Sequence, residues 1–167
     1  MRTGQTGYEI LTERTVEQLK YIHAVYDLAK EKGYIQDATF TGMKHRMEQE
    51  NMQRSEKVAR GEAVYGLKEY TLDLYQEYEL SMIEEAYILD ETNEGMGLTE
   101  EEIEAYYNTR DWIVGEDARK ADLSEARAAV IDEMRRNRYQ ELTEQKAAVA
   151  EVDGDMDQLS QFTLKQL

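Results

Sequence analysis

The chain has 167 residues, which is enough for one compact domain or one elongated helical body and too few for two large domains. Its formal net charge of -16 excludes a basic surface for nucleic acid, because an acidic chain repels phosphate groups. The absence of Pro and Cys excludes disulfides and thiolate metal sites, and it removes the strongest helix breaker from every long segment.

Two helices are expected in the first third of the chain. The first runs from about Glu9 to Lys32 and ends at Gly33, because apolar residues recur there at helical spacing, namely Val16, Leu19, Ile22, Tyr26 and Ala29. Asp37 is expected to cap the second helix, which carries Phe40, Met43, Met47 and Met52 and ends near Arg60. The far half of this second helix is expected to be exposed.

Two glycines, Gly61 and Gly66, bound a segment that predicts a turn or a short extended link between helices, because glycine tolerates positive φ angles. A third helix is expected from about Lys68 to Glu91. Its broad apolar face holds Leu72, Leu74, Tyr75, Tyr78, Met82, Ile83, Ala86 and Leu89. Thr99 and Glu102 then match the capping box of a fourth helix, which Glu100 and Glu101 further stabilise at its positive end.

The segment from Asn108 to Lys120 is polar, and it predicts either a loop anchored by Trp112 or a frayed helix end. Asp122 or Ser124 opens the last helix, whose apolar positions include Val130, Ile131, Met134, Tyr139 and Leu142. A short strand or an extended tail follows Val149. The fold class is therefore all-α, an elongated or cradle-like bundle of about five helices, possibly with a short C-terminal strand, comprising a helical domain over residues 1–152 and a tail over residues 153–167.

Candidate catalytic and metal sites are weak. His23 and His45 lack the spacing of zinc ligands, and adjacent carboxylates such as Glu84 and Glu85 point to different sides of a helix. Asp153, Asp155 and Asp157 fit the start of a calcium loop, but Gln158 and Leu164 occupy the positions that require Gly and Glu. The sequence predicts no catalytic residue, no metal site and no cofactor.

The sequence contains 12 tyrosines and 8 methionines, and these residues are the remaining indication of a function. A tyrosine ring is apolar with a polar end, and methionine adapts to irregular partners, so together they suit a surface that binds varied peptides. Such a stripe is more often a helix core. The residues expected to line a peptide groove are Tyr70, Tyr75, Tyr78, Met82, Tyr106 and Tyr107.

The segment Leu98–Tyr107, with its Leu-Thr-Glu-Glu-Glu-Ile start and paired tyrosines, and the later helix ending in Ala148-Val149 resemble the helical part of SurA- and PrsA-like extracytoplasmic folding factors. In that family a parvulin isomerase domain is often inserted between two such elements. Here only 14 residues separate Tyr107 from Asp122, too few for a parvulin domain. The resemblance therefore implies a chaperone without isomerase activity.

The expected function is the binding of unfolded or partly folded polypeptides, outside the cytoplasm and without catalysis. The alternative is a structural or adaptor protein that binds one folded partner or itself. The N-terminal residues lack the apolar core of a signal peptide, so membrane tethering would need a segment that this sequence does not contain. The sequence leaves the oligomeric state open.

Overall fold

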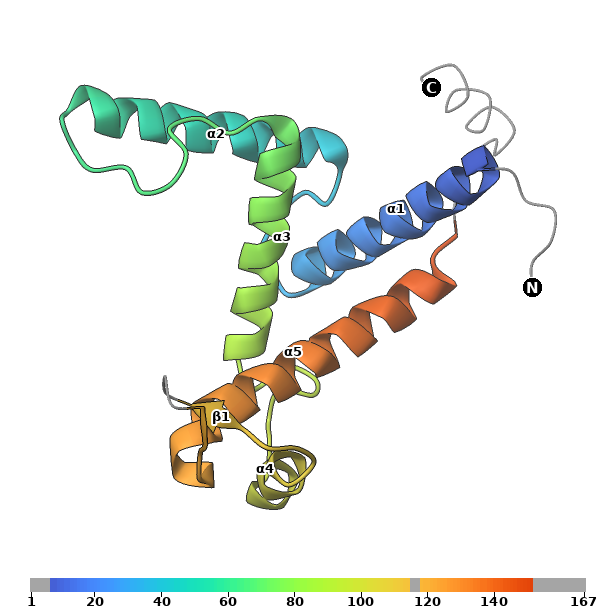
Figure 1. The fold of residues 1–167 in the computed structure, drawn as a ribbon. Coiled ribbons are helices and arrows are strands. Elements are labelled where there is room, and N and C mark those ends of the chain that lie inside the picture. Colours follow the sequence, from blue (N-terminus) through green and yellow to red (C-terminus); the bar gives the residue numbers. More distant parts are fainter. Residues whose placement is uncertain (1–6, 115–117, 152–167) are drawn as a thin grey trace. The chain divides into compact units, whose positions relative to one another are not determined.

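A computed structural model describes residues 7–114 and 118–151. Helices dominate these residues, as predicted, and one two-stranded antiparallel hairpin accompanies them (Figure 1). The helices are α1 (Gly7–Glu31), α2 (Phe40–Ala59), α3 (Leu72–Leu89), α4 (Glu100–Tyr107) and α5 (Leu123–Val149), and the strands are β1 (Ile113–Val114) and β2 (Arg119–Lys120). The predictions of an all-α fold and of about five helices are confirmed.

The described residues fall into two compact units, and α3 and α5 each contribute to both. The first unit contains residues 7–80 and 143–151, and the second contains residues 81–142. Within the first unit, Glu17 and Tyr21 of α1 line a shallow pocket together with Ala147 and Ala148 of α5. The described part of the helical domain predicted over residues 1–152 is thus divided into two compact units.

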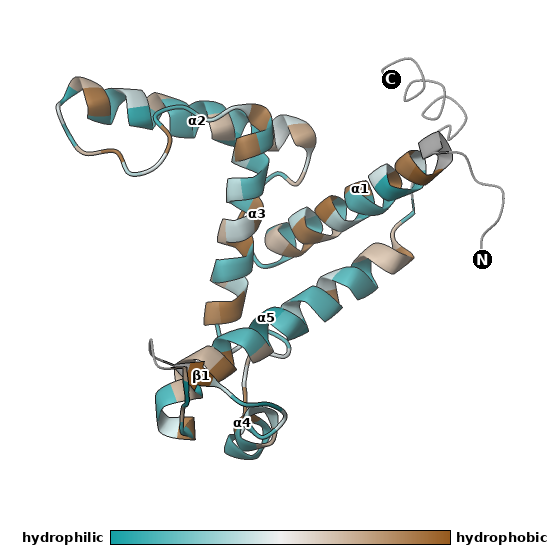
Figure 2. Cartoon of the chain, in the orientation of Figure 1, coloured by the Kyte–Doolittle hydropathy of each residue, from teal (hydrophilic) through white to brown (hydrophobic). Residues whose placement is uncertain are grey.

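Helix α1 spans nearly the predicted range and ends where glycine is needed, but Leu19 of the predicted apolar face is 45% exposed. Hydrophobic residues recur between hydrophilic ones along it (Figure 2). Its buried side chains include Val25, Leu28 and Ala29. Gly33 has a φ of +76°, which side chains with a Cβ rarely adopt, so the chain leaves the helix at this position as expected.

The start of α2 corrects one predicted detail. The N-cap is Thr39, whose hydroxyl accepts a hydrogen bond from the Gly42 amide at 3.1 Å, and it is not Asp37. Asp37 instead accepts a hydrogen bond from the Thr39 amide at 2.8 Å. Asp37 therefore orients the capping residue. When two residues of the capping type lie close together in the sequence, the sequence alone does not identify which of them is the cap.

The connection between α2 and α3 is longer than predicted, because α3 begins at Leu72 and not near Lys68. Gly61 and Gly66 have φ angles of +73° and +78°, and the residues between them form the predicted link between the two helices without regular secondary structure. The chain then runs back along α2 (Figure 1), where Asn51 exchanges two hydrogen bonds with the backbone of Tyr70, at 2.7 and 2.9 Å. These bonds hold the residues before α3 outside the helix.

Helix α4, in the second unit, begins with the predicted capping box. The Thr99 hydroxyl accepts from the Glu102 amide, and the Glu102 carboxylate accepts from the Thr99 amide. Asp122 opens α5 in the same way, since its carboxylate accepts from the Glu125 amide at 3.0 Å and its own amide donates to Glu125. Of the two predicted openers, Asp122 is therefore the cap.

Trp112 anchors the segment between α4 and α5, and the prediction of a frayed helix end is wrong. The indole is 8% exposed and donates a hydrogen bond to the Tyr107 carbonyl at 3.2 Å. Around it the buried core of this unit contains Ile103, Ala121, Ala126, Val130 and Met134. The strands β1 and β2 pair through Ile113 with Lys120 and Val114 with Arg119.

Three predictions concern residues that the structure does not describe. The possible C-terminal strand, the tail over residues 153–167 and the partial calcium pattern at Asp153, Asp155 and Asp157 lie outside the described residues. Among the helices that are described, none combines the length and the apolar character that a membrane span requires.

Candidate functional site

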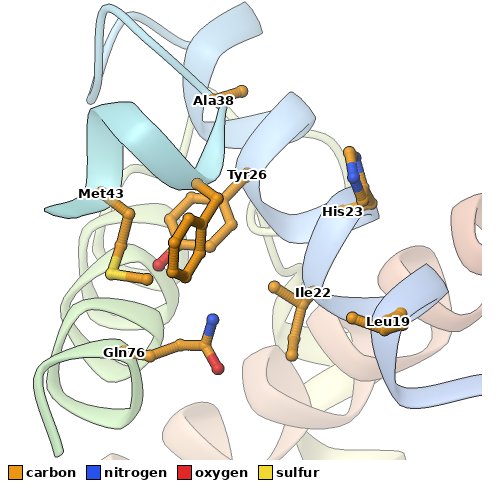
Figure 3. Close-up of a pocket in the computed structure, with 8 residues that line it drawn as sticks. Leu19, Ile22, His23, Tyr26, Ala38, Met43 and Gln76 are labelled. Atoms are coloured by element: carbon orange, nitrogen blue, oxygen red, sulfur yellow. The ribbon is translucent and has the colours of Figure 1, made fainter. Parts of the chain in front are cut away.

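An apolar pocket in the first unit lies among α1, the start of α2 and α3 (Figure 3). Its volume is about 100 Å³. The residues that line it are Leu19, Ile22, His23, Tyr26, Ala38, Phe40, Met43 and Gln76. Among the described residues, no Asp, Glu, Lys or Arg lines this pocket, so it suits one uncharged side chain rather than a charged ligand.

Helical spacing explains why these residues converge. Leu19, Ile22, His23 and Tyr26 occupy positions i, i+3, i+4 and i+7 of α1 and so share one face. Phe40 and Met43 are one turn apart at the start of α2, immediately after the Thr39 cap. Phe40 and Leu19 remain 61% and 45% exposed, so apolar surface surrounds the opening.

Tyr26 is the polar residue at the base of the pocket, and it is only 4% exposed. Its hydroxyl lies near Glu79 but makes no hydrogen bond of standard geometry. Burial, followed by the negative charge of Glu79, raises the pKa of this phenol well above its ordinary value. Tyr26 therefore stays neutral, and it offers the pocket an uncharged ring.

A partly buried ion pair lies next to Tyr26, because the Arg46 guanidinium lies over the Tyr26 ring at 5.8 Å from its centroid. Arg46 donates two hydrogen bonds to the Glu79 carboxylate, at 2.6 and 3.0 Å, and a third to the Asp37 carbonyl at 2.6 Å. The Glu79 side chain is 8% exposed, and it also accepts a hydrogen bond from the Tyr75 hydroxyl at 3.2 Å. The bidentate pairing raises the pKa of Arg46, so its guanidinium group stays charged.

The structure brings three of the six predicted peptide-binding residues together. Tyr70, Tyr75 and Tyr78 form one aromatic cluster with ring centroids 5.0 to 6.0 Å apart, and Arg54 lies over the Tyr70 ring at 4.7 Å. Tyr75 is 6% exposed, and burial followed by Glu79 raises the pKa of its phenol. This ring therefore packs in the core, while Tyr70 and Tyr78 are half-buried.

The other three predicted residues belong to the second unit. Met82 is 52% exposed on α3. Tyr106 donates a hydrogen bond to Glu133 at 2.8 Å, and Tyr107 donates to the Ala121 carbonyl at 2.7 Å. Both rings pack against the core around Trp112, so they stabilise this unit, and their role in binding peptides stays a prediction.

Sequence reasoning missed the pocket as a site, although it named several of its residues as helix faces. The signal was an aromatic residue, Phe40, directly after a helix cap, where a helix start is usually polar. It also missed Arg46 and Glu79, because a charged residue within an apolar stripe is ordinarily read as solvated. Only the hydrogen bonds between them, across 33 positions of sequence, reveal that Arg46 covers the buried Glu79 carboxylate.

In the part of the chain that the structure describes, no three His, Asp or Glu side chains lie close enough together to bind a metal ion. His23 borders the apolar pocket, and His45 is exposed on α2.

Comparison with known proteins gives one curated relative and two related solved structures. The chain is 34% identical over 165 residues to a chaperone for lacto-N-biosidase from Bifidobacterium longum subsp. longum. This alignment covers 98% of the chain and 59% of the relative, so the chain spans little more than half of that protein. No family model matches the sequence.

The solved structures are two crystal structures of a GH136 lacto-N-biosidase from Eubacterium ramulus, one of the native protein and one of its selenomethionine derivative. Their TM-scores are 0.64 and 0.66, at 18% sequence identity. Each match covers 87% of this chain and 29% of the solved chain. At this identity the similarity shows a shared fold.

The predicted relationship to SurA- and PrsA-like folding factors is therefore wrong. The motif on which it rested is a capping box followed by an apolar face, and many unrelated helices share it because it meets the hydrogen-bonding needs of any helix start. The curated relative is named a chaperone and not an enzyme, in agreement with the prediction of a non-catalytic role. By sequence, this chain is similar to a chaperone for a glycosidase.

Proposed function

We propose that this protein is a chaperone for a glycoside hydrolase of the lacto-N-biosidase type and acts on it without catalysis. The observation that carries the proposal is the 34% identity to a chaperone for lacto-N-biosidase, which extends over 98% of the chain. The sequence predicts a protein that binds many non-native polypeptides. Because the relative is named for a single client, we propose the narrower function of binding one hydrolase.

The apolar pocket fits a specific client better than a broad range of clients. Its volume of about 100 Å³ admits one side chain and not a peptide segment, and helices on three sides fix its shape. A preformed pocket loses little conformational entropy on binding, which favours one complementary partner over many weak ones. We infer that an apolar side chain of the hydrolase enters this pocket.

A second candidate is a permanent subunit of the hydrolase, and the solved structures favour it. In the Eubacterium ramulus enzyme the same fold occupies 29% of a chain that is itself a lacto-N-biosidase. Because this fold is part of the enzyme's own chain there, we infer that it also stays bound to the hydrolase here after the client has folded. This candidate corresponds to the adaptor alternative inferred from the sequence.

Co-expression tests the proposal. The lacto-N-biosidase of Bifidobacterium longum is produced with this chain, with its own chaperone, or alone, and soluble activity is measured on a chromogenic lacto-N-bioside. We expect this chain to raise the activity severalfold above that of the hydrolase alone. Phe40→Ser should reduce the gain, and Leu89→Ser, which changes an exposed side chain of the second unit, should preserve it. A gain with the native chaperone but none with this chain would contradict the proposal.

Size-exclusion chromatography of the same products separates the two candidates. A chaperone that acts only during folding elutes apart from active hydrolase, and a permanent subunit elutes with it at a fixed stoichiometry. The extracytoplasmic location expected from the sequence stays a prediction, and alkaline phosphatase fusions expressed from the native reading frame would test it.

A further inference from the structure

The connection after α2 is irregular in backbone and yet held in place from several directions. We call residues 58–69 the hook, which comprises the last two residues of α2 and most of the connection to α3. Arg54 of α2 donates hydrogen bonds from one nitrogen to the carbonyls of Tyr65 and Leu67, at 3.0 and 2.6 Å. Asn51 bonds both backbone groups of Tyr70 directly after the hook. The hook therefore presents its side chains in one arrangement.

Apolar side chains of the hook point into solvent. Tyr65 is 88% exposed, and Val58 and Leu67 are each 45% exposed. Val58 lies one turn after Arg54 on α2, so it shares the face to which the hook is bound. Beside Val58 is a groove of about 430 Å³, lined also by Asn51, Ser55, Lys68 and Glu69.

Charge sets the hook apart from the rest of the chain. The hook and the end of α2 that leads into it, residues 50–69, together contain four basic and four acidic residues, whereas the whole chain carries a net charge of -16. Several of these charges are paired locally, with Arg54 to Glu50 at 2.7 Å and Arg60 to Glu62 at 2.6 Å. A second copy or any acidic protein is repelled by most of this molecule and not by the hook.

We propose that the hook is the docking surface for the folded catalytic part of the hydrolase, with Tyr65 as the anchoring side chain; this inference rests on the proposed function. Interface cores are enriched in tyrosine, and the hook presents an 88% exposed tyrosine, Tyr65, on a segment without net charge. Because Arg54 and Asn51 already hold the loop, binding orders few additional residues. Because the hook carries no net charge, we expect this contact to depend only weakly on salt.

Binding measurements with surface variants test the hook. The Bifidobacterium longum lacto-N-biosidase, purified after co-expression with its own chaperone and stripped of it by affinity capture, is immobilised, and binding of this chain is measured. Tyr65→Ser is expected to weaken binding by about tenfold or more, as for a central aromatic anchor. Tyr65→Phe should retain affinity. Leu89→Ser is the matched control, because it removes an apolar side chain that is 65% exposed outside the hook.

The outcomes separate the inference from the proposed function. If the unaltered chain does not bind and does not raise hydrolase activity in co-expression, the proposed function fails. If the unaltered chain binds and Tyr65→Ser binds equally well, the hook is not the docking surface. If Tyr65→Ser instead converts a dimer of this chain into a monomer in sedimentation, the hook pairs two copies and the inference is also overturned. Equal melting temperatures of all variants show that loss of binding is not loss of fold.

Discussion

Glu79 occupies a position that an apolar residue would normally fill. It lies between Tyr75 and Ile83 on the buried stripe of α3, at i, i+4 spacing. Its charge is tolerated because Arg46 pairs with both carboxylate oxygens and Tyr75 donates a further hydrogen bond. No local pattern predicts this pairing, since Arg46 is on another helix.

Removing Arg46 from its pair with Glu79 should reveal the free-energy cost of burying the Glu79 carboxylate. We expect Arg46→Met to lower the free energy of unfolding by about 3–5 kcal/mol, because it leaves the Glu79 carboxylate buried without its partner. Urea unfolding followed by far-UV circular dichroism measures the change. The double variant Arg46→Met/Glu79→Met should recover most of the loss.

Arg60→Met is the control for that experiment, because Arg60 also pairs with a carboxylate, that of Glu62, but both side chains are at least half exposed. Its unfolding curve should match that of the unaltered protein. Equal curves for Arg46→Met and Arg60→Met would show that the buried position of the Arg46 pair does not matter.

At the scale of elements, helix starts and stops are the features that the sequence predicts best. The Thr99 and Glu102 capping box, the Asp122 cap and the Gly33 stop all depend on residues within four positions of one another. The start of α3 was misplaced because Asn51, about twenty residues earlier, holds the preceding backbone. Contacts of that range are invisible to local patterns.

The capping box of α4 predicts a pH dependence. The hydrogen bond from the Thr99 amide, followed by that from Arg138, holds the pKa of Glu102 below its ordinary value of 4.5. The stabilisation is therefore complete above about pH 4.5 and is lost as the pH falls through the lowered pKa. We expect Glu102→Gln to be less stable than the unaltered protein at pH 6, and the difference to shrink toward pH 3.

Thermal unfolding at a series of pH values measures this difference, in which the titration of all other shared carboxylates cancels. Glu101→Gln is the control, because it removes one negative charge from the same helical turn and leaves the capping box intact. A Glu102→Gln difference that stays constant from pH 6 to pH 3 would show that the carboxylate is not part of the cap in solution.

At the scale of the whole molecule, the chain forms two compact units from what its length predicts as one helical domain. Helices α3 and α5 each supply residues to both units. Unfolding one unit therefore removes the packing that stabilises part of two helices, and isolated helical segments are marginal in water. We infer that the two units unfold together.

The single tryptophan makes this cooperativity measurable. Trp112 is buried in the second unit, so its fluorescence follows that unit alone, whereas far-UV circular dichroism follows every helix. We expect the two signals to give coincident urea midpoints, and Arg46→Met, in the first unit, to shift both midpoints equally. A circular dichroism transition that precedes the fluorescence transition would mean that the first unit unfolds independently.

Sequence by itself determined that this protein is helical, acidic and without a predicted catalytic site, and it located most helix ends. These properties follow from composition, from apolar spacing and from caps formed by residues close in the chain. Tertiary structure decided which side chains are buried and which are presented: Tyr75 and Glu79 are enclosed, while Phe40 and Tyr65 are exposed. The physical reason is that burial depends on partners far apart in sequence, such as Arg46 for Glu79 and Arg54 for the carbonyls of the hook.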